Sequence, residues 1–149
     1  MRARNRRGSE PLHYAADGSP GADWSNPHGQ REVVLLLVRN GADPNVLDST
    51  GVAPLHRAVR TRSSEAVLTL IENGADPRLM NKSGSTPLHL AVQTTGRSGA
   101  GSDAAREEQR RLIAMLLAHG ARPTDADAKG KTVAAAASSA WIRDLLSTA

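Results

Sequence analysis

Residues 84–91 read Gly84-Ser85-Thr86-Pro87-Leu88-His89-Leu90-Ala91. Two other segments keep the Gly, Pro, Leu, His and Ala of this pattern, at residues 8–15 and 51–58. Residues 130–137 are a degenerate copy that lacks both Pro and His. Self-similarity of this kind indicates stacked copies of one supersecondary unit.

A second landmark recurs with the same period. The sequence Gly-Ala-x-Pro begins at Gly41, Gly74 and Gly120; Gly41 and Gly74 are 33 residues apart, as are Pro54 and Pro87. The pattern resembles the ankyrin repeat, a unit of about 33 residues with a β-turn and two helices that carries Thr-Pro-Leu-His-x-Ala. The resemblance covers about residues 5–146. It implies an all-α ankyrin-repeat solenoid of four stacked helix-turn-helix units with short β-turn fingers.

The resemblance also divides the chain. We expect a basic N-terminal arm at residues 1–7 and an ankyrin repeat domain at residues 8–149. Its repeats span about residues 5–47, 48–80, 81–126 and 127–149. The last is a degenerate C-terminal cap, as expected where the outer face meets water. The preference for Arg over Lys and the abundant Ala are typical of a GC-rich bacterium, so we expect a small bacterial-type protein.

Each repeat contains its own helix start and stop signals. Pro11, Pro54 and Pro87 suit the first position of a helix, where no N–H partner is needed. We assign a structural role to Gly41, Gly74 and Gly120, which can adopt the left-handed conformation that ends a helix. Between these signals, apolar rows with helical spacing should form stripes that pack repeat against repeat. The rows are Val33, Val34, Leu36 and Leu37; Ala66, Val67, Leu70 and Ile71; and Leu112, Ile113, Leu116 and Leu117.

Two repeats have extra residues between their helices. The distance from the helix-starting Pro to the helix-ending Gly is 20 residues in the second repeat, but 30 in the first and 33 in the third. We therefore expect two long inter-helix loop insertions, near residues 17–29 and 94–108. Asn26 is a candidate cap of the helix after the first insertion, and Ser102 and Asp103 are candidate caps of the helix after the second. Trp24 is either a loop anchor that folds back onto the helices or an exposed hot spot for a partner.

The composition limits the available chemistry. The chain has 149 residues, 39% hydrophobic and 23% charged, with no Cys and no Phe. Its aromatic residues are Tyr14, Trp24 and Trp141. These counts exclude a disulfide framework, a zinc-thiolate site, a cysteine nucleophile and an aromatic platform for stacked bases. No apolar run reaches the roughly 18 residues of a membrane span and no apolar stretch follows the basic start, so we expect a cytoplasmic protein.

The histidines are the remaining candidate metal ligands. His13, His56 and His89 occupy the same position of three repeats, which the resemblance places about 10 Å apart, far beyond a Zn–N distance of about 2.1 Å. We therefore predict a structural role, in which each ring hydrogen-bonds turn backbone of its own or the next repeat. We expect no metal, no cofactor and no catalytic residue, and we do not expect an enzyme.

Positive charge gives the best clue to a partner. The formal net charge is +4, and residues 1–7 alone contain four Arg. In proteins that this chain resembles, the turn tips and the exposed side of the first helices hold protein partners. The resemblance predicts a rigid, basic concave face for an acidic protein partner. The predicted partner-binding residues are Tyr14, Arg57, Arg60, Lys82, Gln93, Lys129 and Trp24.

Two other interpretations stay open. The face is a solvated surface without a partner, because scattered Lys and Arg are ordinary, or the arm and the face bind a nucleic acid or another polyanion with steep salt dependence. A nucleic acid is the less favoured partner, and we expect a monomer. If the face binds a protein, Arg57→Glu with Arg60→Glu should abolish binding and leave the melting temperature unchanged.

Overall fold

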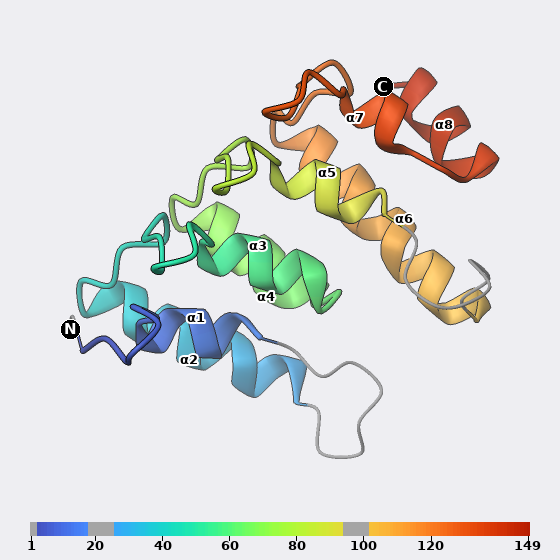
Figure 1. The fold of residues 1–149 in the computed structure, drawn as a ribbon. Coiled ribbons are helices and arrows are strands. Elements are labelled where there is room, and N and C mark those ends of the chain that lie inside the picture. The colour runs from blue at the N-terminus through green and yellow to red at the C-terminus, as the bar shows by residue number, and fades with distance from the viewer. Residues whose placement is uncertain (1–2, 18–25, 94–101) are drawn as a thin grey trace.

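The computed structural model describes residues 3–17, 26–93 and 102–149 as a stack of helices (Figure 1). In chain order the helices are α1 (Pro11–Ala16), α2 (Pro27–Arg39), α3 (Pro54–Arg60), α4 (Ser64–Glu72), α5 (Pro87–Ala91), α6 (Asp103–Ala118), α7 (Val133–Ala136) and α8 (Ala140–Ser147). Within these ranges there is no strand, only an isolated antiparallel bridge between Ala126 and Thr132. None of the described helices combines the length and the apolar character needed to cross a bilayer.

Proline and polar side-chain caps set the helix starts. Helices α1, α2, α3 and α5 have Pro in their first turn. Asn26 caps α2 by accepting the N–H of Gly29 at 3.0 Å, and Ser102 caps α6 by accepting the N–H of Ala105 at 3.2 Å. Both are the caps that the sequence predicts, and each satisfies a backbone donor that the first turn leaves free.

Three helices end in the same left-handed turn. The glycines that follow α2, α4 and α6 have positive φ: 91° at Gly41, 102° at Gly74 and 101° at Gly120. After α2 the N–H of Ala42 bonds to the carbonyl of Leu37 at 3.0 Å, and the N–H of Gly41 bonds to that of Val38 at 3.0 Å. This is the Schellman pattern, which a residue with a Cβ enters only with strain.

The helices form two layers. In one layer α1 contacts α3, α3 contacts α5 and α5 contacts α7; in the other, α2 contacts α4 and α4 contacts α6. Within the stack, α1 packs on α2, α3 on α4 and α5 on α6. One continuous aliphatic core lies between the layers. Its largest fully buried apolar side chains are Leu12, Leu55, Leu70, Leu88, Leu112, Ile113, Leu116 and Ile142.

One of the predicted apolar rows is only half buried. In α2, Val34 and Leu37 belong to the core, but Val33 is 47% exposed and Leu36 is 61% exposed. The prediction of a fully packed stripe is therefore wrong for these two residues. The reason is position, because α2 lies in the first helix pair, and the described residues stack on it from one direction only (Figure 1).

A turn built on one Asn or Asp precedes each helix pair. One side-chain oxygen accepts the N–H groups two and four residues onward, at 2.8–3.1 Å, in the turns of Asn5, Asp48, Asn81 and Asp127. The first of these turns begins inside the predicted N-terminal arm, and Arg4 pairs with Glu10 at 3.0 Å. Asn5 and Arg7, which lie in the predicted arm, thus contribute to the first turn, and Arg4 pairs with a residue beside it.

Successive turns touch each other along one side of the stack (Figure 1). The N–H and Oγ of Ser49 donate to the carbonyl of Arg7 at 2.9 and 2.6 Å, and the N–H of Ala128 donates to the carbonyl of Ser83 at 3.2 Å. The approach is closest at Gly84, where an added Cβ would lie 2.4 Å from the backbone nitrogen of Ala128. The turns therefore form a row of linked fingers.

Candidate protein interface

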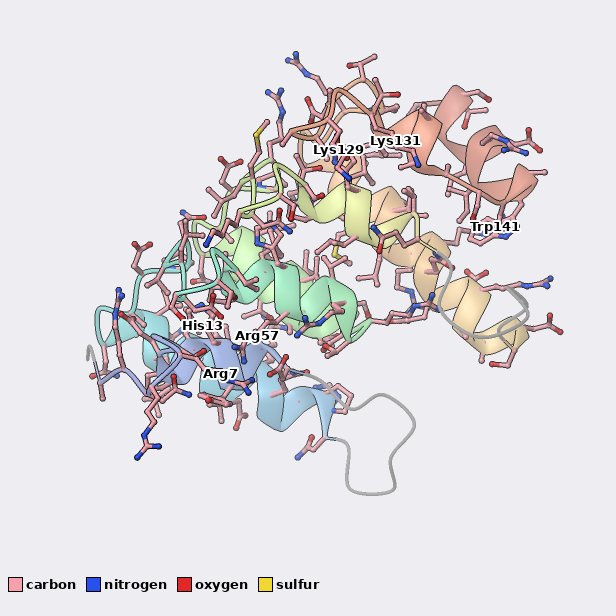
Figure 2. All side chains as sticks on the ribbon, in the orientation of Figure 1. Arg7, His13, Arg57, Lys129, Lys131 and Trp141 are labelled. Atoms are coloured by element: carbon pink, nitrogen blue, oxygen red, sulfur yellow. The ribbon has the colours of Figure 1, made fainter. Side chains whose placement is uncertain are left out.

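The finger tips carry a row of cations. Arg7 lies in the first finger, Lys82 in the third, and Lys129 and Lys131 in the fourth; all four side chains are exposed. None of them makes an ion pair with a described residue. Figure 2 labels Arg7 near the first turn and both fourth-finger lysines near α7. These charges are available to a molecule that approaches the fingers.

The carboxylates of the same fingers are occupied by the turns themselves. Backbone N–H groups of Lys131 and Lys129 lower the pKa of Asp127, against the opposing effect of burial. Burial alone would raise the pKa of Asp48, but hydrogen bonds from Thr50, Val52 and Arg57 outweigh it and lower that pKa to about 2. Both groups are therefore anions. Asp48 is buried and paired with Arg57, and Asp127 lies beside Lys129, so the exposed cations of the fingers keep an excess of positive charge.

The rings of His13 and His89 link their helices, α1 and α5, to the finger of the next repeat. The Nδ1 atom of His13 accepts the N–H of Glu10 at 3.1 Å, so Nε2 carries the proton and donates to the carbonyl of Val52 at 2.9 Å. His89 repeats the arrangement, with Thr86 on one side and the carbonyl of Lys131 at 3.0 Å on the other. Both ring nitrogens of His13 and His89 are used, which leaves no lone pair for a metal.

His56 occupies the equivalent position on α3 but makes one hydrogen bond fewer than His13 and His89. Its Nδ1 atom accepts the N–H of Ala53 at 3.1 Å, whereas its buried Nε2 has no hydrogen-bond partner among the described residues. Burial lowers the pKa of His56, and the backbone of Ser85 and Leu79 opposes this effect only in part. The ring is therefore neutral at pH 7. The described residues contain no group of His, Asp or Glu that could hold a metal ion.

Arg57 is placed differently from the sequence interpretation. Its guanidinium lies between the first two repeats, 3.1 Å from the carboxylate of Asp17 and 3.2 Å from that of Asp48. It also donates to the hydroxyl of Ser9 at 2.8 Å and lies 5.4 Å from the ring centre of Tyr14. With its side chain only 13% exposed, Arg57 joins two repeats and does not offer a free cation. The expectation that Arg57→Glu leaves melting unchanged is corrected for that reason.

Two other predicted residues meet at one pocket. Arg60 and Gln93 line it, together with Arg62, at the ends of α3 and α5 farthest from the fingers. Apolar walls come from Val59 and Leu90. Arg60 is exposed and has no ion pair with a described residue. The candidate surface thus has a cationic row at the fingers and a second cationic site at the opposite end of the inner helices, which are α1, α3, α5 and α7.

A family model of ankyrin repeats (3 copies) matches residues 22–100. The chain belongs to the ankyrin repeat family. Ankyrin repeats are generally protein–protein interaction modules and are typically non-catalytic. No curated protein matches the chain.

Of the remaining predicted residues, the structure describes Tyr14 but not Trp24. Tyr14 is 54% exposed; its hydroxyl bonds to the amide of Asn5, and its ring lies beside Arg57. Its location on α1 keeps it on the same layer as Arg60. Trp24 and the Gly-rich stretch at residues 94–101 lie outside the described residues.

Sequence reasoning missed the side chains that tie the ankyrin repeats together at their edges. Asp48 and Asn81, which organise two of the turns, are 33 residues apart, so the same periodicity that located Pro54 and Pro87 was a usable signal for them. The pair formed by Arg78 and Asp125, with two hydrogen bonds of 3.0 and 2.7 Å, had no such signal.

Proposed function

We propose that this ankyrin repeat chain is a non-catalytic binding module whose concave, basic face holds an acidic segment of a partner protein. The observation that carries the proposal is the imbalance at the fingers. Lys82, Lys129 and Lys131 are exposed and have no ion pair within the described residues. Of the turn carboxylates, Asp48 is paired with Arg57, which leaves Asp127 as the anion beside these lysines. A field of one sign steers a segment of the opposite sign and fixes its orientation.

The rigidity of the fingers supports the same proposal. Each turn is closed by an Asn or Asp side chain, and the first two fingers and the last two are linked by backbone hydrogen bonds. A preformed surface loses less conformational entropy on association than a mobile one. Binding would therefore cost mainly the ordering of the lysine side chains.

We further propose that the module consists of four repeat units and acts as a monomer, with residues 127–149 as its C-terminal cap. In this unit α7 has only four residues, and α8 carries exposed Arg143 and Asp144. Polar side chains on a terminal repeat suit a face that meets water. Trp141 supports the attachment of the cap, since its ring lies 5.6 Å from the guanidinium of Arg110 on α6 (Figure 2).

The polyanion alternative is less well supported. It needs the cations of the N-terminal segment, and one of these, Arg4, is paired with Glu10, whereas Arg7 has no ion pair with a described residue. The two hypotheses differ in salt dependence, because a purely electrostatic polyanion complex loses most of its affinity by about 0.5 M salt. A partner held also by apolar and hydrogen-bonding contacts should remain bound under those conditions.

Charge reversal at the tips tests the proposal. We expect Lys82→Glu with Lys129→Glu to lose a partner that the unmodified chain captures from extracts of its native source. Arg31→Glu with Arg39→Glu is the matched control, since both residues are exposed on α2 and the change in net charge is the same. Equal capture by the tip variant and the control would refute the basic face as the binding surface.

A further inference from the structure

The pocket at the far end of the inner helices has a composition that the fingers lack. Arg60 and Arg62 come from the end of α3, Gln93 follows α5, and the walls are Val59, Leu90 and Leu112. No Asp or Glu is among the described residues that line it. A small cavity with two guanidinium groups above aliphatic walls is suited to a short side chain that ends in an anion.

Arg62 occupies a backbone conformation that an Arg seldom adopts. Its φ is 55°, and it is the one residue other than Gly with positive φ in the described parts of the chain. Gly or Asn would enter this left-handed region more readily, because the Cβ of other residues is crowded there. The turn that ends α3 requires this conformation, because the N–H of Ser63 bonds to the carbonyl of Ala58 at 2.9 Å and the N–H of Arg62 bonds to that of Val59 at 3.0 Å, the same Schellman pattern as after α2.

The guanidinium of Arg62 is also incompletely compensated. Burial lowers its pKa, and no carboxylate opposes this effect. The guanidinium makes no hydrogen bond or ion pair within residues 3–17, 26–93 and 102–149. A partly desolvated cation without a counterion gains more from an anion than a fully solvated lysine does.

The polar floor of the pocket is already satisfied. The Nε2 group of Gln109 donates to the carbonyls of Ala91 at 2.8 Å and of Gln93 at 3.1 Å, which uses both of its protons. The arginines and the side-chain amide of Gln93 therefore remain as donors for a ligand, and of these the arginines carry charge. Their forked N–H groups bind a carboxylate through two parallel hydrogen bonds.

From this geometry we propose that the pocket is a specificity site for one Glu or Asp side chain of the bound protein segment, with an apolar neighbour against Leu90 and Val59. The inference rests on the proposed function and adds to it. The fingers provide general attraction for an acidic segment, and the pocket selects where one carboxylate lies. Arg62 thereby becomes a binding residue, although the sequence patterns did not single it out.

The test uses the full chain and a library of random linear peptides displayed on phage. We expect wild-type selection to enrich peptides with one acidic residue beside an apolar one. Selected peptides are then synthesised with a fluorescent label, together with their Glu→Gln or Asp→Asn counterparts, and titrated by anisotropy. Arg62→Gly should weaken binding of the acidic peptide about tenfold and leave binding of its amide counterpart almost unchanged.

The variant was chosen so that a loss of binding cannot be confused with unfolding. Because Gly suits the left-handed backbone, Arg62→Gly should melt at or above the wild-type temperature. Arg39→Gln, an exposed Arg on α2, is the matched control and should bind as wild type does.

The outcomes separate the pocket from the wider proposal. If selected peptides bind Arg62→Gly as tightly as wild type but fail to bind Lys82→Glu, the pocket is refuted and the basic face stands. If no peptide is enriched, or the enriched ones have no acidic residue, the carboxylate site is refuted. Even then, the proposal of a protein-binding function would stand if Lys82→Glu with Lys129→Glu loses the native partner.

Discussion

Replacing Arg57 by Met should destabilise the fold, because the guanidinium joins the first two repeats. It is held by Asp17 at 3.1 Å, Asp48 at 3.2 Å and the hydroxyl of Ser9 at 2.8 Å. Met has a similar apolar stem and keeps much of the packing beside Tyr14 while it removes the charge. The substitution therefore isolates the ionic contribution.

The magnitude follows from the exposure of the two carboxylates. The side chain of Asp48 is 4% exposed, so without Arg57 it becomes a buried anion that is held only by neutral donors, the turn backbone and the hydroxyls of Thr50 and Ser9. Loss of one partner of a buried ion pair costs about 3–5 kcal/mol. Asp17, at 33% exposure, recovers some solvation, so we expect the lower end, about 3 kcal/mol. For a chain of this length that corresponds to a fall of about 6–12 °C in Tm.

Thermal unfolding followed by circular dichroism measures the effect. Arg60→Met is the matched control, because Arg60 also lies on α3 but is exposed and has no ion pair with a described residue. The Tm of this variant should change by less than about 2 °C. Adding Asp48→Asn to Arg57→Met should cost less than Asp48→Asn costs alone, since the partner is already gone. A Tm of Arg57→Met within about 2 °C of wild type would refute the ionic link between the repeats.

Four substitutions test other parts of the structure. Leu70→Ala, at a side chain with 0% exposure, should cost about 2–5 kcal/mol in chemical denaturation, and an unchanged midpoint would contradict its place in the core. The pKa of Asp48 is lowered from 3.8 to about 2. Its ionised carboxylate therefore contributes about 2 kcal/mol to the free energy of unfolding above pH 3.8, and this contribution is lost as the pH falls towards 2. Asp48→Asn should remove this component from the acid-unfolding curve. Gly120→Ala, with nothing within 4 Å of the added Cβ, should lower the free energy of unfolding by about 1 kcal/mol. Gly84→Ala also brings its Cβ against Ala128, so its fall in Tm should be at least twice that of Gly120→Ala.

The features that could be predicted from the sequence are those that repeat with it. The helix-starting prolines, the glycines after α2, α4 and α6, and the caps Asn26 and Ser102 act through backbone groups within a few residues. Each such signal is local, so the sequence carries it at a fixed spacing. Burial of the aliphatic rows is also periodic, but the prediction failed at Leu36, because the described residues pack on only one side of α2.

Contacts between repeats were harder to predict, because they join residues that no short-range pattern connects. Arg57 and Asp17 are 40 positions apart and are separated by a loop whose length breaks the period. Arg78 and Asp125 are 47 apart for the same reason. The sequence pattern could place an Arg of α3 on the exposed face of that helix. It could not identify the carboxylate with which that Arg pairs. Arg60 and Arg57, three residues apart on one helix, thus received the same interpretation although their surroundings differ.

The contacts between neighbouring fingers bear on binding as well as on stability. Gly51 lets the backbone of Lys82 approach, because a Cβ at that position would lie 2.9 Å from the nitrogen of Lys82. The carbonyl of Ser83 is in turn bonded to Ala128. Lys82 therefore stands on a backbone held from both sides, and its position is fixed before a partner arrives. Gly84→Ala, which pushes these fingers apart without removing any charge, should weaken binding of an acidic partner at a temperature where the variant is fully folded. Unchanged affinity would show that the fingers adapt to the partner and that their rigidity contributes nothing to recognition.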